Sequence, residues 1–172
     1  MNRKAVLARF ARLVALAGSI AALLWWGSWQ LSPYIRIGIN ASDSLPGWVY
    51  VAYPGDKAHL QVGDTIGFYP APNRFYPPSF LFIKLVAGIA GDRLTWGKDY
   101  PAGTTFYING QEFGRAKPQA RTGEPLQHTP AGTVPDGAVF VWTPHPDSFD
   151  SRYADMGLIP NSQVVGRAQR LF

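Results

Sequence analysis

A long uncharged segment dominates the hydrophobic pattern near the N-terminus. Residues 13–31, LVALAGSIAALLWWGSWQL, contain no Asp, Glu, Lys or Arg. As an α-helix this segment spans about 28 Å, close to the hydrocarbon thickness of a bilayer. Trp25, Trp26 and Trp29 gather at its far end, and aromatic side chains favour the membrane–water interface. The pattern therefore predicts one transmembrane helix.

Beyond about Pro33 the pattern changes to short apolar or alternating runs separated by turn signals, which is typical of β-strands. The pair Asn109-Gly110, between TFYI and QEF, is the strongest hairpin signal. Two stretches, Arg115–Thr133 and Thr143–Pro160, are irregular, and we expect the first to be a surface excursion. The predicted strands are Trp48–Tyr53, Thr65–Tyr69, Leu81–Ala87, Thr105–Ile108, Ala138–Trp142 and Gln163–Leu171.

These runs predict a mainly β fold, an antiparallel barrel-like domain behind the single helix. We expect Tyr50 and Phe80 to pack in its core. The chain of 172 residues suits one such domain and has no cysteine. A disulfide framework, a thiol nucleophile, an iron–sulfur cluster and a cysteine zinc site are therefore excluded.

The charge distribution predicts the orientation of the helix. Four of the 16 basic residues lie in residues 1–12, and the first acid is Asp43. Positive charge before a span favours a cytoplasmic N-terminus. We therefore expect a basic cytoplasmic segment at 1–12, an anchor at 13–31 and an exported, periplasmic domain at 32–172. A cleaved signal peptide would need a shorter apolar region and a small-x-small cleavage site, and a buried soluble helix would need a polar face.

The same count argues against nucleic acid as a partner. The formal charge is 16 − 11 = +5, but without the four N-terminal cations it is 12 − 11 = +1. The exported domain therefore lacks the basic excess that nucleic-acid binding favours. His59, His128 and His145 have no second His or Glu at metal-ligand spacing, so we expect no metal and no cofactor.

Lys84 is the most informative single residue. It interrupts an apolar strand, where Phe82 and Val86 share its face and Ile83 and Leu85 point the other way. Burial lowers the pKa of a lysine from about 10.4, and a neutral amine can act as a general base for a serine. The alternatives are a lysine at a sheet edge that reaches water, or one paired with a carboxylate.

Two further segments carry serines. Asn40–Tyr50, NASDSLPGWVY, places Ser44 only 13 residues after the apolar segment, and His145–Gly157, HPDSFDSRYADMG, contains Ser148. Taken alone, Ser-Leu-Pro-Gly is also a turn sequence, and the second segment is also compatible with a surface loop holding an ordinary Asp–Arg pair.

Together, in this order behind an anchor, the three segments resemble the signal peptidase I (S26) family of Ser/Lys proteases. Ser42-Asp43-Ser44-Leu45-Pro46 resembles its S-x-S-M-x-P motif, with one residue fewer before the proline. Residues 84–92, KLVAGIAGD, keep the Lys, Gly and Gly-Asp of K-R-x-x-G-x-P-G-D, and residues 148–152, SFDSR, resemble N-S-x-D-S-R. The shortened first motif and DSFDSRY look most like the conjugative-transfer branch, the TraF-type peptidases.

The resemblance implies a role for each matching residue. Ser44 would be the nucleophile and Lys84 its general base. Ser148 would orient the amine of Lys84, and the hydroxyl of Ser42 would join the backbone N–H of Ser44 in an oxyanion hole. The supporting ion pair would be formed by Asp150 and Arg152, and a direct catalytic part for Asp150 stays open.

Two departures from the family pattern bear on the subfamily and the substrate more than on the reaction. Leu85 replaces the usual Arg after the lysine. Thr143-Pro144-His145-Pro146 stands where G-D-N-R often opens the last motif.

The resemblance also implies the partners: the bacterial inner membrane and an exported pre-protein or pro-pilin. The most specific expectation is maturation of a conjugative pilin, with cyclisation if an internal amine replaces water as acyl acceptor. The alternatives are a general housekeeping signal peptidase and, in another class, a non-catalytic membrane-anchored β-domain of an envelope assembly.

Overall fold

The computed structural model describes residues 3–40, 42, 44–55, 57, 59–101 and 103–172. The side chains of residues 3–8 and 100 are also outside the description. The chain divides into two compact units, residues 1–35 and residues 36–172.

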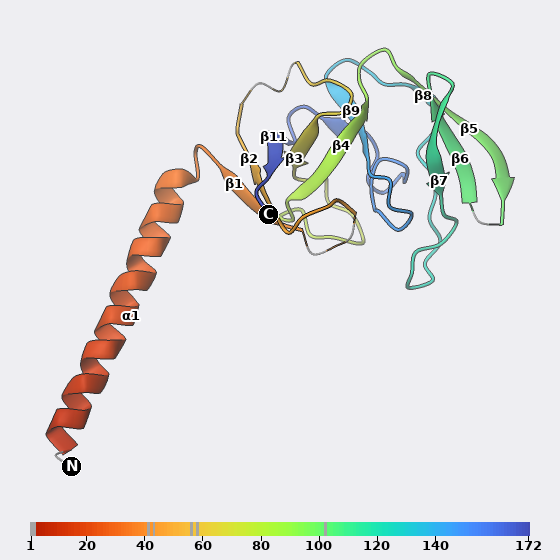
Figure 1. The fold of residues 1–172 in the computed structure, drawn as a ribbon. Coiled ribbons are helices and arrows are strands. Elements are labelled where there is room, and N and C mark those ends of the chain that lie inside the picture. Colours follow the sequence, from red (N-terminus) through yellow and green to blue (C-terminus); the bar gives the residue numbers. More distant parts are fainter. Residues whose placement is uncertain (1–2, 41, 43, 56, 58, 102) are drawn as a thin grey trace. The chain divides into compact units, whose positions relative to one another are not determined.

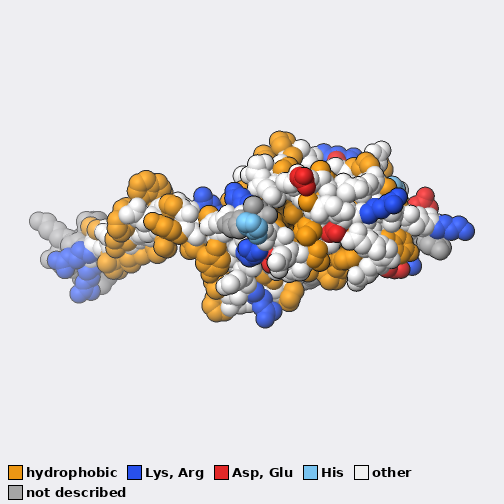
Figure 2. Space-filling view, turned by 90° about the horizontal axis from the view of Figure 1, so that it is seen from above, with side chains coloured by type: hydrophobic (Ala, Val, Ile, Leu, Met, Phe, Trp, Pro, Cys, Tyr) orange, Lys and Arg blue, Asp and Glu red, His pale blue; other side chains and the backbone are white. Residues whose placement is uncertain are grey.

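The first unit is a single helix, α1 (Arg3–Leu31). Its segment Arg9–Leu31 is long and apolar enough to cross a membrane, and none of it is buried by other parts of the chain. Figure 2 shows hydrophobic side chains along the visible face of this helix. The hydroxyls of Ser19 and Ser28 donate hydrogen bonds to backbone carbonyls within the helix, so these polar groups have partners in the helix itself. The helix begins well before residue 13 because the Ala, Leu, Lys and Arg of the basic segment also favour helix.

The second unit is built on a seven-stranded antiparallel sheet that curls into a half-barrel, which confirms the predicted fold class (Figure 1). Its strand order is β1-β2-β11-β3-β4-β9-β10. The strands are β1 (Arg36–Ile39), β2 (Val49–Ala52), β3 (Thr65–Phe68), β4 (Phe82–Gly88), β9 (Ala138–Trp142), β10 (Ile159–Pro160) and β11 (Val164–Arg170).

A separate four-stranded sheet has the order β7-β6-β5-β8. The predicted hairpin joins β6 to β7, with Asn109 and Gly110 at φ angles of 52° and 80°. Positive φ at both central residues is the geometry that an Asn-Gly pair favours. The strands are β5 (Arg93–Tyr100), β6 (Gly103–Ile108), β7 (Gln111–Ala116) and β8 (Gly132–Thr133).

Two hydrophobic clusters form the core. One joins Phe68, Val86, Val141 and neighbouring side chains of the large sheet, and the other is centred on Phe106 of the small sheet. Tyr50 is buried, as predicted, whereas the prediction for Phe80 is wrong because 52 % of this residue is exposed. Phe80 precedes β4, and its ring lies about 6 Å from those of Tyr76 and Phe82 instead of entering the sheet.

Candidate active site

Lys84 lies on β4, a strand paired on both sides, with β3 and with β9. Its cross-strand partner on β3 is the buried Ile66, and Val86 of its own strand lies in the core. Only 4 % of Lys84 is exposed, and its ammonium lies 5.9 Å from the centre of the Phe82 ring. The position is therefore a buried central strand, which excludes a lysine that reaches water from a sheet edge.

The amine of Lys84 has one hydrogen-bond partner among the described residues. Its Nζ donates to the hydroxyl of Ser148 over 2.7 Å. Burial lowers the pKa of Lys84 from 10.5 to about 8, partly opposed by the nearby carboxylate of Asp150 and assisted by Arg152. With that pKa roughly a tenth of the amine is neutral at pH 7, compared with about one part in 2,500 for an ordinary lysine.

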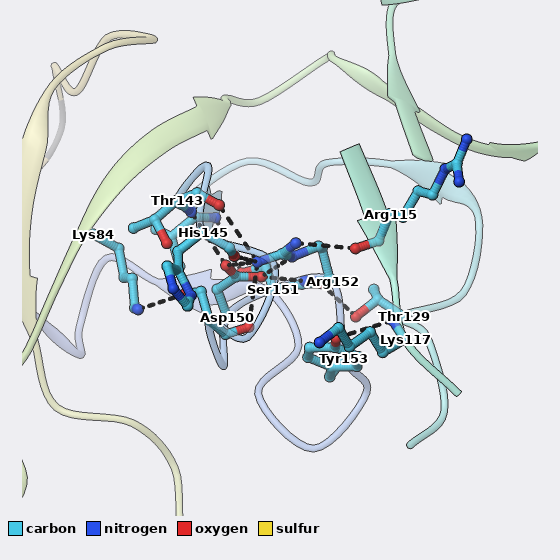
Figure 3. Close-up of polar contacts among 12 residues, drawn as sticks. Lys84, Arg115, Lys117, Thr129, Thr143, His145, Asp150, Ser151, Arg152 and Tyr153 are labelled. Carbon is cyan, nitrogen blue, oxygen red and sulfur yellow. Dashed lines mark hydrogen bonds and ion pairs between the residues drawn. The ribbon is translucent and has the colours of Figure 1, made fainter. Parts of the chain in front are cut away.

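The Ser148 loop, residues 143–152, is held by a buried ion pair. The carboxylate of Asp150 contacts the guanidinium of Arg152 at 2.8 Å and 2.9 Å. Figure 3 shows Asp150 and Arg152 side by side, with Thr143 and His145 close to them. The guanidinium also donates to the carbonyls of Arg115, Thr143, His145 and Ser148. A single cation thus supplies hydrogen bonds to several carbonyls of the loop, of which that of His145 also accepts from the N–H of Ser148.

Ser151 joins the same loop to the neighbouring strand. Its hydroxyl accepts from the backbone N–H of Val141 on β9, and its own N–H donates to the Val141 carbonyl. Its carbonyl accepts from the hydroxyl of Thr129. Because β9 pairs with β4, these bonds keep Ser148 in register with Lys84.

The Ser44 loop, residues 40–48, connects β1 to β2. The hydroxyls of Ser42 and Ser44 lie 2.9 Å apart, and Ser42 is exposed while Ser44 is half-buried. Asp43, between them in the sequence motif, lies outside the described residues. The structure therefore brings the two serines of the first motif together at the surface.

Gly47 explains how the loop returns to the sheet. Its φ is +96°, and a Cβ here would lie 2.3 Å from Cδ of Arg170 and 2.5 Å from the carbonyl oxygen of Phe172. Only glycine allows this close approach without displacement. The carbonyl of Phe172 accepts a hydrogen bond from the N–H of Trp48, so the last residues of the chain support the end of the loop.

A cleft of about 770 Å³ is lined by residues of the Ser44 loop, by Leu85 of β4 and by Pro144 and His145 of the Ser148 loop. Among the described residues, no hydrogen bond joins Ser44 to Lys84. The predicted site residues thus form two groups, Ser42 with Ser44 and Lys84 with Ser148, Asp150 and Arg152, and the cleft borders the loops of both. No group of three or more metal-ligating side chains occurs in the described part of the chain.

The family model for signal peptidase, peptidase S26, matches residues 7–172. The chain belongs to this family. A probable conjugal transfer protein TraF from Sinorhizobium fredii (strain NBRC 101917 / NGR234) is 28 % identical over 175 residues, which cover 92 % of this chain and 84 % of the relative. Membership of the signal peptidase family implies peptidase chemistry on an exported protein, and it agrees with the single apolar helix at the N-terminus.

Three residues around the cleft of this signal peptidase family member were not predicted from its sequence to belong to the site. Asn40 bonds both to Ser42 and to two loop carbonyls. Leu85 and His145 were noted in the sequence, but neither was predicted to belong to the site, yet both line the cleft. Alternation along β4 could have indicated Leu85, since it faces away from Lys84, whereas no pattern in the sequence marks the bonds of Asn40.

Proposed function

We propose that this chain is a membrane-anchored Ser/Lys endopeptidase that removes a signal peptide or pro-peptide from an exported protein. The observation that carries the proposal is the buried Lys84. The pKa of its amine is lowered, and the amine donates to Ser148, whose loop lines a cleft together with Ser44.

In this mechanism the hydroxyl of Ser44 attacks the carbonyl carbon of the scissile bond while neutral Lys84 accepts its proton. The C–N bond then breaks, and the ammonium of Lys84 returns the proton to the leaving amine. Water, activated by the same amine, attacks the acyl-enzyme and releases the product. Ser148 orients the amine of Lys84 throughout, and Asp150 with Arg152 holds Ser148 in place.

The attack requires Ser44 to exchange its hydrogen bond with Ser42 for one with Lys84. Catalytic hydrogen bonds are often long or misaligned before the substrate binds, and they tighten in the complex. When the hydroxyl of Ser42 turns from Asn40 to the substrate, it can donate to the oxyanion together with the N–H of Ser44. A single such donor contributes about 2.7–4 kcal/mol to transition-state stabilisation.

The first experiment compares Ser44→Ala and Lys84→Ala with the original chain in a processing assay on an exported pro-protein. We expect both variants to lose about 10⁴-fold or more in rate. The matched controls are Ser162→Ala and Lys98→Met, because both positions are exposed and neither residue lines the cleft. Full processing by either dyad variant would contradict the mechanism.

The pH dependence of the same assay tests the base. The rate should rise with an apparent pKa of about 8, because only the neutral amine of Lys84 accepts a proton. Between pH 7 and pH 9 the neutral fraction increases roughly tenfold. A flat profile over this range would exclude Lys84 as the base.

We also propose that the N-terminus is cytoplasmic and that residues 32–172 face the periplasm. Arg9 and Arg12 precede the most apolar part of the helix, which supports this orientation. The chain has no cysteine, so a single Asp136→Cys substitution in an exposed turn provides a unique label. A membrane-impermeant thiol reagent should modify this cysteine from outside the inner membrane. If the cysteine is not modified in spheroplasts, the orientation is the opposite of the proposed one.

The proposed substrate is a conjugative pro-pilin, and the similarity to the TraF relative supports it. A panel containing one conjugative pro-pilin and several general pre-proteins tests this choice. Selective processing of the pilin is expected, whereas equal processing of all would indicate a housekeeping peptidase. The mass of the product distinguishes its form, because a cyclic product is lighter than the hydrolysed one by one water.

A further inference from the structure

The Ser44 loop contains an asparagine whose side-chain amide uses all of its hydrogen-bonding capacity. Nδ2 of Asn40 donates to the carbonyl of Leu45 over 2.7 Å and to that of Gly47 over 2.9 Å. Its Oδ1 accepts from the backbone N–H of Ser42 at 3.3 Å and lies 3.2 Å from the Ser42 hydroxyl. Two donors and two acceptor positions are thus all occupied within one loop.

The orientation of this amide follows from its partners. The carbonyls of Leu45 and Gly47 can only accept, so they must face the NH₂ group of Asn40. Its oxygen is therefore turned towards Ser42. No flipped arrangement satisfies the same four contacts.

Few other hydrogen bonds hold the rest of the loop in place. The backbone N–H of Asn40 donates to the carbonyl of Trp48 at the neck of the loop, over 2.8 Å. Within residues 42–47, among the described residues, no backbone–backbone hydrogen bond joins one residue of the loop to another. The Tyr50 hydroxyl donates to the carbonyl of Pro46. Besides the packing of Gly47 against Arg170 and the burial of Leu45, the amide of Asn40 is therefore the main hydrogen-bonding group that shapes the loop around the two serines.

The amide oxygen of Asn40 also determines which of the two serine hydroxyls donates in the hydrogen bond between them. Ser42 has one hydroxyl proton, and Oδ1 of Asn40 can only accept it. When that proton points to Asn40, the hydroxyl of Ser44 is left to donate to Ser42 across 2.9 Å. The chain of bonds then runs from Ser44 to Ser42 to Asn40, and the oxygen of Ser42 is fixed beside that of Ser44.

We propose that Asn40 is a positioning residue for peptide-bond cleavage, acting through Ser42 and through the closed shape of the Ser44 loop. This inference rests on the proposed function. Asn40 holds the oxygen of Ser42 where its hydroxyl can turn from the amide to the oxyanion. The bond from the Ser42 N–H keeps that serine in place while its hydroxyl turns.

The test is a set of substitutions in the full chain, assayed for kcat and KM on a processed pro-protein. Asn40→Ala should lower kcat about 10–100-fold, less than the loss of an oxyanion donor itself, while KM changes less than about threefold. In a Ser42→Ala background the same substitution should cost clearly less, because the bond to the Ser42 hydroxyl is already absent and only the contacts with the loop backbone are left to lose. Equal losses in both backgrounds, or a loss confined to KM, would overturn the inference.

Asn40→Asp is the conservative variant. It keeps an acceptor for Ser42 but turns a carboxylate oxygen towards the carbonyls of Leu45 and Gly47, which repel it, so its kcat should fall below that of the original chain. Activity equal to that of the original chain would contradict the part assigned to the two donors of Asn40. This comparison also remains informative if Asn40→Ala fails to fold, because Asp matches Asn in size.

Asn73→Ala is the matched control. Asn73 closes another loop in a similar way, accepting from the N–H groups of Phe75 and Tyr76 and donating to the carbonyl of Ala71, but it does not line the cleft. It should leave kcat unchanged. Loss of activity in Ser44→Ala with full activity in Asn40→Ala would reject this inference alone, whereas an active Ser44→Ala would reject the proposed function.

Discussion

The two halves of the candidate site are built in opposite ways. On the lysine side, Lys84, Ser148, Asp150 and Arg152 are at most 4 % exposed and bonded into the sheet through the Ser148 loop. On the serine side, Ser42 is exposed, Ser44 is half-buried, and side-chain bonds shape the loop. The difference follows from chemistry: a lysine must be dry to lose its proton readily, whereas a nucleophile must be open to its substrate.

Because of this contrast, we expect substitutions on the lysine side to affect stability as well as activity, and those on the serine side to affect mainly activity. Substitutions on the lysine side remove partners from buried charges, which destabilises the whole domain. Substitutions on the serine side alter an open loop and should change the reaction with little effect on the unfolding free energy. Substitutions in both parts of the molecule test this difference, in order from the largest expected effect on stability to the smallest.

The largest effect is expected from Asp150→Ala. It leaves the guanidinium of Arg152 buried without its counter-charge, so the unfolding free energy should fall by about 3–5 kcal/mol. Urea titration of the detergent-solubilised chain, followed by tryptophan fluorescence, measures the change. The double variant Asp150→Leu with Arg152→Met removes both charges and should recover part of the loss. A stability change below about 1 kcal/mol in Asp150→Ala would show that the buried pair does not support the fold.

The next effect concerns the charge of Lys84. Its folded-state pKa is about 8 and its ordinary value is 10.5, so between these values the unfolded chain binds more protons than the folded chain. Raising the pH across this window therefore stabilises the fold, by about 3 kcal/mol in total, and lowering it through pH 8 removes that gain. The difference between the original chain and Lys84→Met, measured by urea titration from pH 7 to pH 10.5, isolates the effect from other titrating groups. A constant difference over this range would contradict the lowered pKa.

Gly47→Ala should act on both properties at once. Gly47 and Gly63 have nearly equal φ angles, +96° and +95°, but a Cβ at Gly63 meets nothing within 4 Å. Both substitutions should cost about 1–2 kcal/mol for the left-handed conformation. Only Gly47→Ala should also displace Arg170 and the Ser44 loop, so only this variant should lose processing activity. Equal activity in the two variants would indicate that the close approach at Gly47 does not shape the site.

The smallest effect is expected from Lys117→Met. The Lys117–Asp147 ion pair joins the surface of the Ser148 loop to a neighbouring segment, but its side chains are 37 % and 29 % exposed. Water screens such a pair, so the unfolding free energy should change by less than about 1 kcal/mol. A loss comparable to that of Asp150→Ala in the same titration would show that burial is not what separates the two pairs.

The sequence predicted the elements whose side chains follow a simple pattern. The apolar runs of β2, β3, β4, β6, β9 and β11 were each located within about two residues. Strand β5 was missed because RLTWGKDY contains charges and a glycine, and its pairing with β6 and β8 rather than its composition makes it a strand. Strand β1 was missed because RIGI also contains a charge and a glycine, and its pairing with β2 makes it a strand.

The candidate site shows the same limit. Burial of Lys84 was predictable from its apolar neighbours, and the choice of Ser44 and Ser148 came from resemblance to a family. Which groups bond to which was not predictable, since the contacts of Arg152 and of Asn40 are mostly with backbone carbonyls, and any residue supplies a carbonyl. Periodicity reports the face on which a side chain lies, and it carries no information on backbone acceptors in irregular loops.

The bond between Lys84 and Ser148 spans 64 residues of sequence, which sets an order of events during synthesis. A ribosome delivers Ser44 first, Lys84 next and the Ser148 loop close to the end. Ile66 of β3 precedes Lys84 in the chain, whereas β9, Ser148 and the Asp150–Arg152 pair all follow it. A chain that stops before them therefore carries both members of the proposed dyad without the partner that orients the amine of Lys84.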